Sequence, residues 1–342
     1  MKTTDFARYL TSFLGSYLPT LRNVSSNTVS SYSDTFRLFL QYYQSIAGNR
    51  IERLTMKQFN TELISGFLDW LEKERNCSVS TRNQRLACIH AFVRYVETEL
   101  PENLFELQKI MAIPSKKCTH ENMTYLSVEA MSVLLNEPDI SIKRGRRDLM
   151  LLTLLYDSGA RVQELINLSV KDVRTSAPAT ITLLGKGRKI RSIPLMSRTN
   201  KMLVQYLKEQ QFWEIPEKLD SPLFFNSRNE RLTRAGITYI IQKYVDKAKN
   251  NTDIIFPEKV TPHVFRHTKA MHLLQSNINL IYIRDFLGHV SITTTEIYAR
   301  ADSETKRKAL EAAYVNAGTP MQPDWNDDKN LMVWLKNICI CK

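Results

Sequence analysis

The sequence predicts a mainly α-helical protein with one small β-sheet, and three observations carry this prediction. Apolar residues recur at helical spacing through most of the chain. Between Asn27 and Ile46, for example, they are Tyr32, Phe36, Phe39, Leu40 and Tyr43. Only two runs, Ala179 to Leu184 and Lys189 to Leu195, have the alternation and composition typical of strands. The 342 residues include only 10 glycines and 12 prolines and are 43% hydrophobic, which favours compact domains over disorder.

The N-terminal part, to about Ile113, is predicted to contain four helices joined by short loops. The first covers Asp5 to Leu18 and the second Asn27 to Ile46. Thr55 is the expected cap of a third helix, and Ser78 or Ser80 that of a fourth. A proline followed by polar and charged residues then marks a linker. The predicted divisions are a helical domain at 1–114, a linker at 115–122, a second domain at 123–314 and a tail at 315–342.

The fourth predicted helix begins with a polar and basic group. Its members are Thr81, Arg82, Asn83 and Arg85. Helix N-termini and Arg or Asn side chains are common contacts to phosphates and base edges, so this face is a candidate DNA-binding surface. The alternative is an ordinary solvated first turn.

The overall charge points to a polyanionic partner. The formal charge is +12 and the pI is near 9.4. Nucleic acid is the commonest such partner, because Lys and Arg contacts to phosphates supply most non-specific affinity. The alternative is a basic but merely solvated surface.

The cysteines and apolar stretches indicate the compartment. Five cysteines without paired C-x-x-C spacing predict a reducing, cytoplasmic environment and no disulfide framework. The longest apolar stretch, Leu149 to Tyr156, is too short to span a bilayer, and no secretory signal is visible.

The first candidate functional residues of the second domain follow a buried helix. That helix, Leu149 to Ser158, is expected to end at Gly159, and Arg161 follows at once. An arginine that directly follows a rigid helix and a glycine turn is held by its neighbours, which suits a guanidinium group that must point in a fixed direction. Glu164 is three residues further and could orient it. A purely structural Arg-Glu pair is the alternative.

The two predicted strands flank a basic hairpin turn. Lys186 lies at its tip, between Gly185 and Gly187, where it could reach into a DNA groove, and Arg188, which follows, is a further candidate DNA contact. The segment does not continue as a phosphate-cradling G-x-x-x-x-G-K-[ST] loop, so no nucleotide cofactor is predicted.

The segment from Thr261 to Arg300 concentrates histidine, arginine and tyrosine. Thr261 and Pro262 open a helix to about Gln275, with His263 and Arg266 on one face. A second helix, Leu280 to Leu287, is expected to stop at Gly288. His289 follows at the turn, Ser291 can cap a third helix, and Tyr298 lies in that helix. The turn should fold His289 and Tyr298 back towards the face that carries His263.

The histidines have other readings. His263 and His267 are four residues apart and could bind zinc, but position 264 is valine, so the metalloprotease pattern with its glutamate is absent. We interpret His267 and His272 as structural.

Three motifs in this order, SGARVQEL, PHVFRHTKA and LGHVSITTTEIYA, with the lysine hairpin between the first and second, resemble those of the tyrosine recombinases of the phage integrase family. The resemblance covers about Leu126 to Arg300 closely and the helical N-terminal part more loosely. It implies a core-binding domain and a mixed α/β catalytic domain that clamp double-stranded DNA. It also implies cleavage and rejoining through a 3'-phosphotyrosyl link, with no metal and no cofactor.

The family's catalytic roles then fall on six positions. Tyr298 would be the nucleophile, and Arg161 and Arg266 would clamp the non-bridging phosphate oxygens. His263 and His289 would add hydrogen bonds and assist proton movement, and Lys186 would protonate the leaving 5'-oxygen. Glu164 matches a supporting acidic position.

The C-terminal tail has apolar residues at helical spacing, namely Leu331, Trp334, Leu335 and Ile338. By resemblance it is a candidate for exchange between protomers of a tetramer on two DNA sites, and the alternative is a tail folded back on its own subunit. The short N-terminal region leaves no room for a separate arm-binding domain, which favours integration or excision of a mobile element. Two competing functions are a type IB topoisomerase-like relaxing enzyme and a non-catalytic DNA-binding regulator.

Overall fold

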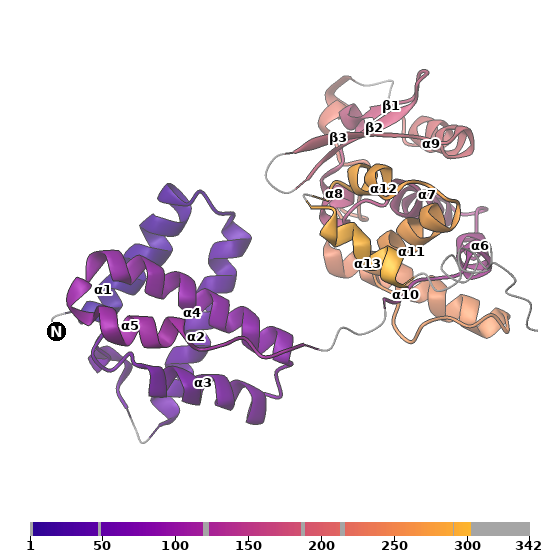
Figure 1. Ribbon diagram of the computed structural model, residues 1–342. Helices are drawn as coiled ribbons and strands as arrows, with labels where there is room; N and C mark the ends of the chain where they lie inside the picture. Colours follow the sequence, from indigo (N-terminus) through magenta and orange to yellow (C-terminus); the bar gives the residue numbers. More distant parts are fainter. Residues whose placement is uncertain are drawn as a thin grey trace, which may run out of the picture. The chain divides into compact units, whose positions relative to one another are not determined.

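The computed structural model describes residues 3–46, 49–118, 123–185, 189–212, 216–289 and 291–301. The chain forms two compact units, residues 1–121 and 122–342 (Figure 1). Each unit has its own hydrophobic core. Within the described residues, no helix is both long and apolar enough to cross a membrane.

The first unit is entirely helical in its described part. Its longer elements are α1 (Asp5–Ser12), a π-helix η1 (Phe13–Leu21), α2 (Ser26–Ser45), α3 (Thr61–Lys73), α4 (Val79–Glu99) and α5 (Leu104–Met111). Phe92 of α4 lies at the centre of the core, with its ring 5.0 Å from that of Phe36 and 5.6 Å from that of Phe59. Such edge-on aromatic contacts stabilise beyond simple burial.

Two expectations for this unit were wrong in detail. The third helix begins at Thr61 with Asn60 as its cap, because the Asn60 side chain accepts from Leu63 N at 2.9 Å. Thr55 instead bonds the side chain of Gln58 in a preceding turn. A fifth helix, α5, follows the four that were predicted. The cap at Ser78 is confirmed for α4.

The predicted basic face at the start of α4 is not free. Arg82 is only 6% exposed and donates to the carbonyl of Pro114 at 3.2 Å. Arg85 donates to Ser31 O at 3.1 Å and to Thr35 Oγ1 at 2.9 Å. Both guanidinium groups therefore tie α4 to neighbouring segments, and the predicted contacts of Arg82 and Arg85 with DNA stay predictions. Thr81 and Asn83 are partly exposed, and their contact with DNA stays a prediction.

The second unit combines helices with one small sheet. Its elements are α6 (Val128–Asn136), α7 (Lys143–Ser158), α8 (Val162–Asn167), β1 (Val173–Arg174), β2 (Thr180–Leu184), β3 (Ile190–Pro194), α9 (Ser197–Glu209), α10 (Arg234–Asn251), α11 (Pro262–Gln275), α12 (Leu280–Leu287) and α13 (Thr293–Ala301). The sheet is antiparallel in the order β1-β2-β3, with Leu183 opposite Arg191. The hairpin of β2 and β3 is as predicted. Strand β1 has only two residues, too few to show an alternating pattern in the sequence.

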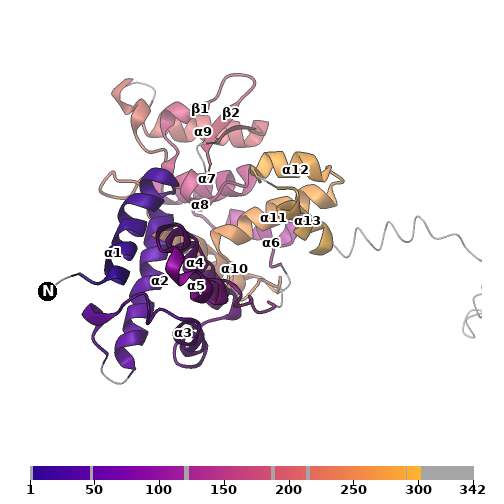
Figure 2. The same ribbon diagram turned by 60° about the vertical axis from the view of Figure 1, so that its left-hand side comes forward.

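The core of the second unit is built around α7. Leu151, Leu152, Leu154 and Leu155 are fully buried there. Gly159 ends the helix in the left-handed conformation, with φ 55°. Helix α11 packs against α7, and α11, α12 and α13 pack against one another (Figure 2). The C-terminal helices are thereby packed, through α11, on the most deeply buried helix described above, α7.

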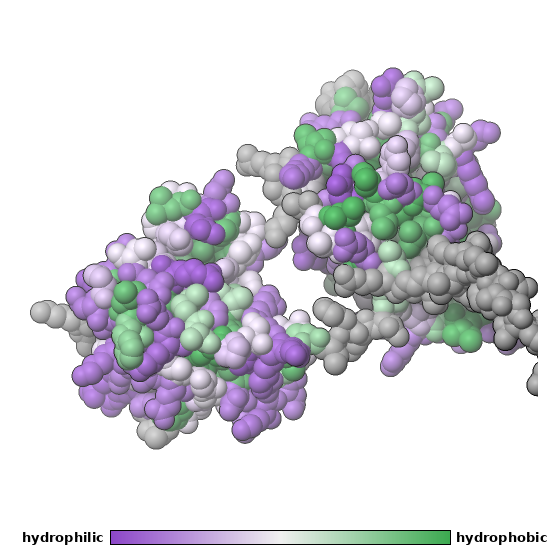
Figure 3. All heavy atoms as spheres, viewed as in Figure 1, coloured by the Kyte–Doolittle hydropathy of each residue, from purple (hydrophilic) through white to green (hydrophobic). Residues whose placement is uncertain are grey.

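Hydrophobic residues also reach the surface of this unit. Figure 3 shows them gathered on one face, in the region where α12 and α13 lie in Figure 1. The exposed large side chains of these helices are Ile281, Tyr282 and Ile297. Among the described residues, α12 and α13 thus bury one side in the core and expose apolar side chains on another.

Candidate active site

Arg161 lies at the junction that the glycine turn after α7 creates. It precedes the first residue of α8, and its backbone N donates to Glu164 Oε2 at 2.7 Å. Its Nη1 donates to Glu164 Oε1 at 2.8 Å and its Nη2 to the carbonyl of Gly288 at 3.3 Å. The side chain is still 33% exposed, so part of the guanidinium is open to a ligand.

Arg266 of α11 is far more enclosed, at 4% exposed. Its two terminal nitrogens donate at 2.7 Å to the carbonyls of Gly159 and Leu287, which lie at the C-terminal ends of α7 and α12. Helix C-terminal carbonyls lack helical partners and carry partial negative charge, so they suit a buried guanidinium. Burial, and then the charge of Arg161, lower the pKa of Arg266 to about 10, which leaves it charged at neutral pH.

The turn between α12 and α13 brings His289 and Tyr298 to α11, as the sequence predicted. Gly288 has φ 67° and ends α12. Tyr298 is 1% exposed, and its hydroxyl lies 3.1 Å from Nδ1 of His267. The His289 ring stacks on the Tyr298 ring with centroids 6.2 Å apart, and His289 Nδ1 bonds Thr295 Oγ1 at 2.9 Å.

His263 occupies the first turn of α11, on the same side as His267. Their ring centroids are 6.4 Å apart. Thr261 is at the capping position and Pro262 at the first helical position, as expected, although the Thr261 side chain makes no capping hydrogen bond. The sequence-predicted residues Arg161, His263, Arg266, His289 and Tyr298 are thus gathered around the junction of α7, α11, α12 and α13.

The electrostatics of this cluster are those of an anion site. Burial, followed by the charges of Arg266 and Arg161, lowers the pKa of His289 to about 4 and also lowers that of His263. Burial raises the pKa of Tyr298 despite the opposing effect of the two arginines. At neutral pH the cluster therefore holds two cationic guanidinium groups, neutral imidazoles and a protonated phenol. That combination suits a phosphate diester, which carries one negative charge on two exposed oxygens.

Comparison with protein-family models assigns the chain to a family. Residues 124–305 match the model of the phage integrase family, and residues 10–99 match that of the phage integrase N-terminal SAM-like domain. The chain belongs to the phage integrase family. It is a tyrosine site-specific recombinase by this membership, and the predicted resemblance is confirmed.

Two relatives and one solved structure illustrate the likeness. The Sinorhizobium fredii protein y4rC, provisionally named an integrase/recombinase, is 35% identical over 98% of this chain and 99% of its own length. The tyrosine recombinase XerC of Pelotomaculum thermopropionicum is 28% identical over 88% of this chain and 96% of its own. The XerH site-specific recombinase, in a post-cleavage complex with palindromic difH substrate, superposes with a TM-score of 0.66 at 22% identity, over 89% and 84% of the two chains.

The recombinase fold reveals a residue that sequence reasoning missed, Arg191 of β3. Its Nη1 and Nη2 donate to the two carboxylate oxygens of Glu164 at 2.9 and 2.7 Å. Glu164 therefore bridges Arg161 and Arg191, and these bonds outweigh burial to lower its pKa to about 2. The sequence signal is the spacing of two between Arg191 and Ile193 in the predicted strand, which puts both on one face, and the structure shows that this face points inward. A charged side chain on that face needs a partner.

The hairpin tip that carries Lys186 and Arg188 lies outside the described residues. Its base is described: Gly185 N donates to the carbonyl of Lys189 at 2.8 Å. A Cβ on Gly185 would be 3.3 Å from Glu164 Oε1, so the base of the hairpin lies against the carboxylate that holds Arg161.

The two remaining histidines of α11 differ in their contacts. His272 bonds Tyr156 Oη at 2.8 Å and the Leu126 carbonyl at 3.0 Å, which agrees with a structural role. His267 instead contacts the hydroxyl of Tyr298, which the sequence did not indicate. Within the described residues, no group of three or more His, Cys, Asp or Glu side chains is arranged to hold a metal ion.

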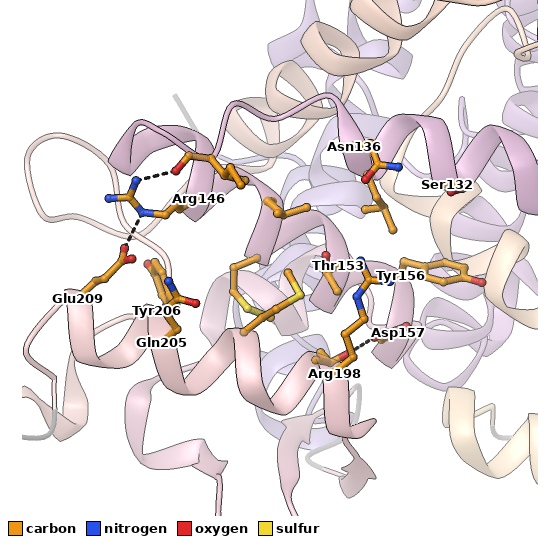
Figure 4. A pocket seen from close by; sticks show the side chains of 16 residues that line it. Ser132, Asn136, Arg146, Thr153, Tyr156, Asp157, Arg198, Gln205, Tyr206 and Glu209 are labelled. Atoms are coloured by element: carbon orange, nitrogen blue, oxygen red, sulfur yellow. Dashed lines mark hydrogen bonds and ion pairs between the residues drawn. The ribbon is translucent and has the colours of Figure 1, made fainter.

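Cavities of two sizes are found among the described residues of the second unit. The smaller, about 270 Å³, is part of the candidate site and is lined by Arg161, Gly185, Lys189, Ile190, Arg191, Asp285, Gly288 and His289. The larger, about 590 Å³, lies between α6, α7 and α9 and contains the ion pair of Arg146 and Glu209 (Figure 4). Arg161 and His289 border the smaller cavity, whereas Tyr298, Arg266 and His263 are not among the residues that line it.

Proposed function

We propose that this recombinase cleaves and rejoins double-stranded DNA through a 3'-phosphotyrosyl intermediate formed on Tyr298. The observation that supports the proposal best is the burial of Tyr298, a residue that is 1% exposed, in the same cluster as the guanidinium groups of Arg161 and Arg266. A phenol with a raised pKa is a poor nucleophile alone, and it needs both a phosphate-polarising charge and a route for its proton.

The proposed chemistry assigns one task to each group. The Tyr298 oxygen forms a bond to phosphorus while the bond from phosphorus to the 5'-oxygen breaks. Arg161 and Arg266 neutralise the non-bridging oxygens, where charge increases in the transition state. Lys186 protonates the leaving 5'-oxygen. Rejoining reverses these steps with a 5'-hydroxyl as nucleophile, so the energy of the phosphoester is kept and no ATP is consumed.

The remaining site residues would support this geometry. His263 and His289 would donate hydrogen bonds to the phosphate and assist the transfer of the phenolic proton away from Tyr298. Glu164 would hold Arg161 in place beside the base of the hairpin. The two bonds from Arg191 to Glu164 favour this role, because they leave the carboxylate few ways to move.

We further propose that residues 1–114 form a DNA-clamping domain, that 115–122 link it to the catalytic domain at 123–314, and that a tetramer acts on two DNA sites. The net charge of +12 and the difH-bound structure of XerH support a DNA partner. Arg188 is a candidate contact to the DNA backbone. The tail at 315–342 lies outside the described residues, and its exchange between protomers rests on the apolar spacing of its sequence.

For the biological role, we propose integration or excision of a mobile element. The support is the full-length similarity to y4rC, whose provisional name includes integrase. A plasmid with two copies of the element's joined ends should lose the intervening DNA when the recombinase is present. Relaxation of plasmids without such sites would favour the topoisomerase-like alternative.

The first test is covalent trapping. The protein is incubated with a nicked suicide duplex that covers the ends of its own element, and products are separated under denaturing conditions. We expect a covalent protein–DNA band with the wild type and with Tyr282→Phe, a matched control because Tyr282 is an exposed tyrosine of α12. Tyr298→Phe should give no band. Binding without a band in the wild type would reject the catalytic proposal and favour a DNA-binding regulator.

A further inference from the structure

The hydrogen bond of the Tyr298 hydroxyl is made by a histidine outside the six positions assigned above. Among the hydrogen bonds of the described residues, Tyr298 Oη is joined to Nδ1 of His267 at 3.1 Å. The His289 ring lies nearly parallel to the Tyr298 ring, with centroids 6.2 Å apart, and its Nδ1 is hydrogen-bonded to Thr295 Oγ1. His263 lies one helical turn before His267 on α11.

We propose that His267 is a further catalytic residue, the general base that takes the phenolic proton when Tyr298 attacks DNA. The proposal deepens the proposed function and rests on it. As the Tyr298 oxygen bonds to phosphorus, its proton passes to His267 Nδ1, while the 5'-oxygen leaves with a proton from Lys186. On rejoining, the tyrosine oxygen leaves phosphorus and recovers its proton from His267, and the attacking 5'-hydroxyl returns a proton to Lys186.

Burial explains why an internal base is required. Tyr298 is 1% exposed, so hydroxide and bulk water have little access to its hydroxyl in this conformation. Arg266 remains protonated at neutral pH and cannot accept a proton. Imidazole is the usual group for this task, and Nδ1 is already at hydrogen-bond distance from the oxygen.

The charges around His267 link its basicity to DNA. Burial, then His263, then Arg266 lower the pKa of His267 to about 4, so without DNA it is a weak base. The groups that face it are His263 and Arg266 of α11, Tyr298 of α13, and His289 at the turn before α13. A phosphate bound to the arginines offsets the field of Arg266 and raises the proton affinity of His267. The nucleophile is thereby activated when its target is in place.

A two-substrate cleavage assay tests this role. Single-turnover rates are measured on a suicide duplex with the normal 5'-oxygen at the scissile phosphate and on one with a 5'-bridging sulfur, whose thiolate leaves without a proton. His267→Asn places an oxygen near the position of Nδ1 but does not take up a proton in the neutral range. We expect it to slow cleavage about 100-fold or more on both substrates. The Lys186→Ala protein should cleave the 5'-oxygen substrate slowly, and its cleavage rate should be restored on the 5'-sulfur substrate.

The pH dependence gives a readout that a merely structural role would not move. In His267→Asn the rate should rise about tenfold per pH unit as the phenol ionises, whereas the wild type should be flatter. A His267→Asn protein with the wild-type rate and pH profile would overturn the proposal. Absence of any covalent product with wild type would instead reject the proposed function.

A second measurement does not depend on the stability of a His267 variant. In Tyr298→Phe bound to its DNA site, the ring of His267 is titrated by nitrogen NMR and compared with the DNA-free protein. We expect its pKa to rise on DNA binding. An unchanged pKa would contradict activation by the bound phosphate.

Discussion

Replacing Glu164 by glutamine removes one negative charge from between two guanidinium groups and keeps the side-chain shape. The carboxylate is 4% exposed and accepts from Arg161 and Arg191. Its pKa falls from 4.5 to about 2 on folding. At about 1.36 kcal/mol per pKa unit, the charged form contributes roughly 3 kcal/mol of stability at pH 7. This agrees with the roughly 3–5 kcal/mol that loss of one partner of a buried ion pair costs.

The sign of the pH dependence follows from the lowered pKa. Above pH 4.5 the carboxylate is ionised in both states and its full contribution is present. The contribution is lost as the pH falls from about 4.5 to about 2, because the unfolded chain binds the proton first. The stability difference between wild type and Glu164→Gln should therefore be largest near pH 7 and smaller by roughly 1 kcal/mol at pH 3.5.

Scanning calorimetry of the full chain at several pH values measures this difference. At about 2–4 °C per kcal/mol, the transition of the second unit should fall by roughly 6–12 °C at pH 7. Asp220→Asn is the control, because Asp220 pairs with Lys171 at 79% exposure and such pairs contribute roughly 0–1 kcal/mol. A Glu164→Gln protein as stable as wild type, or a stability difference that does not change with pH, would refute the assignment of this carboxylate as the ionised bridge between Arg161 and Arg191.

Three further predictions concern the same site. Arg266→Lys should reduce the single-turnover cleavage rate by about 100-fold or more while DNA binding persists. Lysine cannot bond two backbone carbonyls and still present a planar charge to phosphate. Gel-shift assays measure the binding and cleavage assays the rate. Gly288→Ala should lower the melting temperature by roughly 2–8 °C, since the glycine has φ 67° and the new Cβ would lie 3.1 Å from atoms of Arg191. Gly15→Ala is the control and should leave the melting temperature unchanged, because nothing lies within 4 Å of its Cβ. His289 has a pKa of about 4 in the folded state against 6.5 ordinarily, so stability should rise with pH across that window, and His289→Asn should flatten the rise in thermal unfolding.

Much of the local structure could be predicted because its causes are local. Ser127 caps α6 and Thr233 caps α10 through side-chain oxygens a few residues from the amides they accept. Gly288 ends α12 because a left-handed residue is needed there. The error at Thr55 has the same origin, because threonine and asparagine both fit a cap and it is Asn60 whose side chain accepts from the helix, at Leu63 N.

The basic face of α4 illustrates what a helical wheel cannot decide. Arg82 and Arg85 occupy a polar stripe that the sequence leaves free to face solvent or DNA. In the folded unit, the carbonyls of Pro114 and Ser31 come within reach of these guanidinium groups. Their partners are 32 and 54 residues away, so the outcome depends on how α2 and the segment after α5 pack against α4.

The sequence by itself determined the family, the order of Arg161, His263, Arg266, His289 and Tyr298, and the glycine turn that returns the tyrosine to α11. These features depend on residue identity and short spacing, which a linear chain records directly. Only the tertiary structure decided that Arg191 shares Glu164 with Arg161, and that His267 is the histidine that bonds Tyr298. Both contacts join segments 27 and 31 residues apart, and their geometry is set by the packing of β3 and α13 on the core rather than by any local rule.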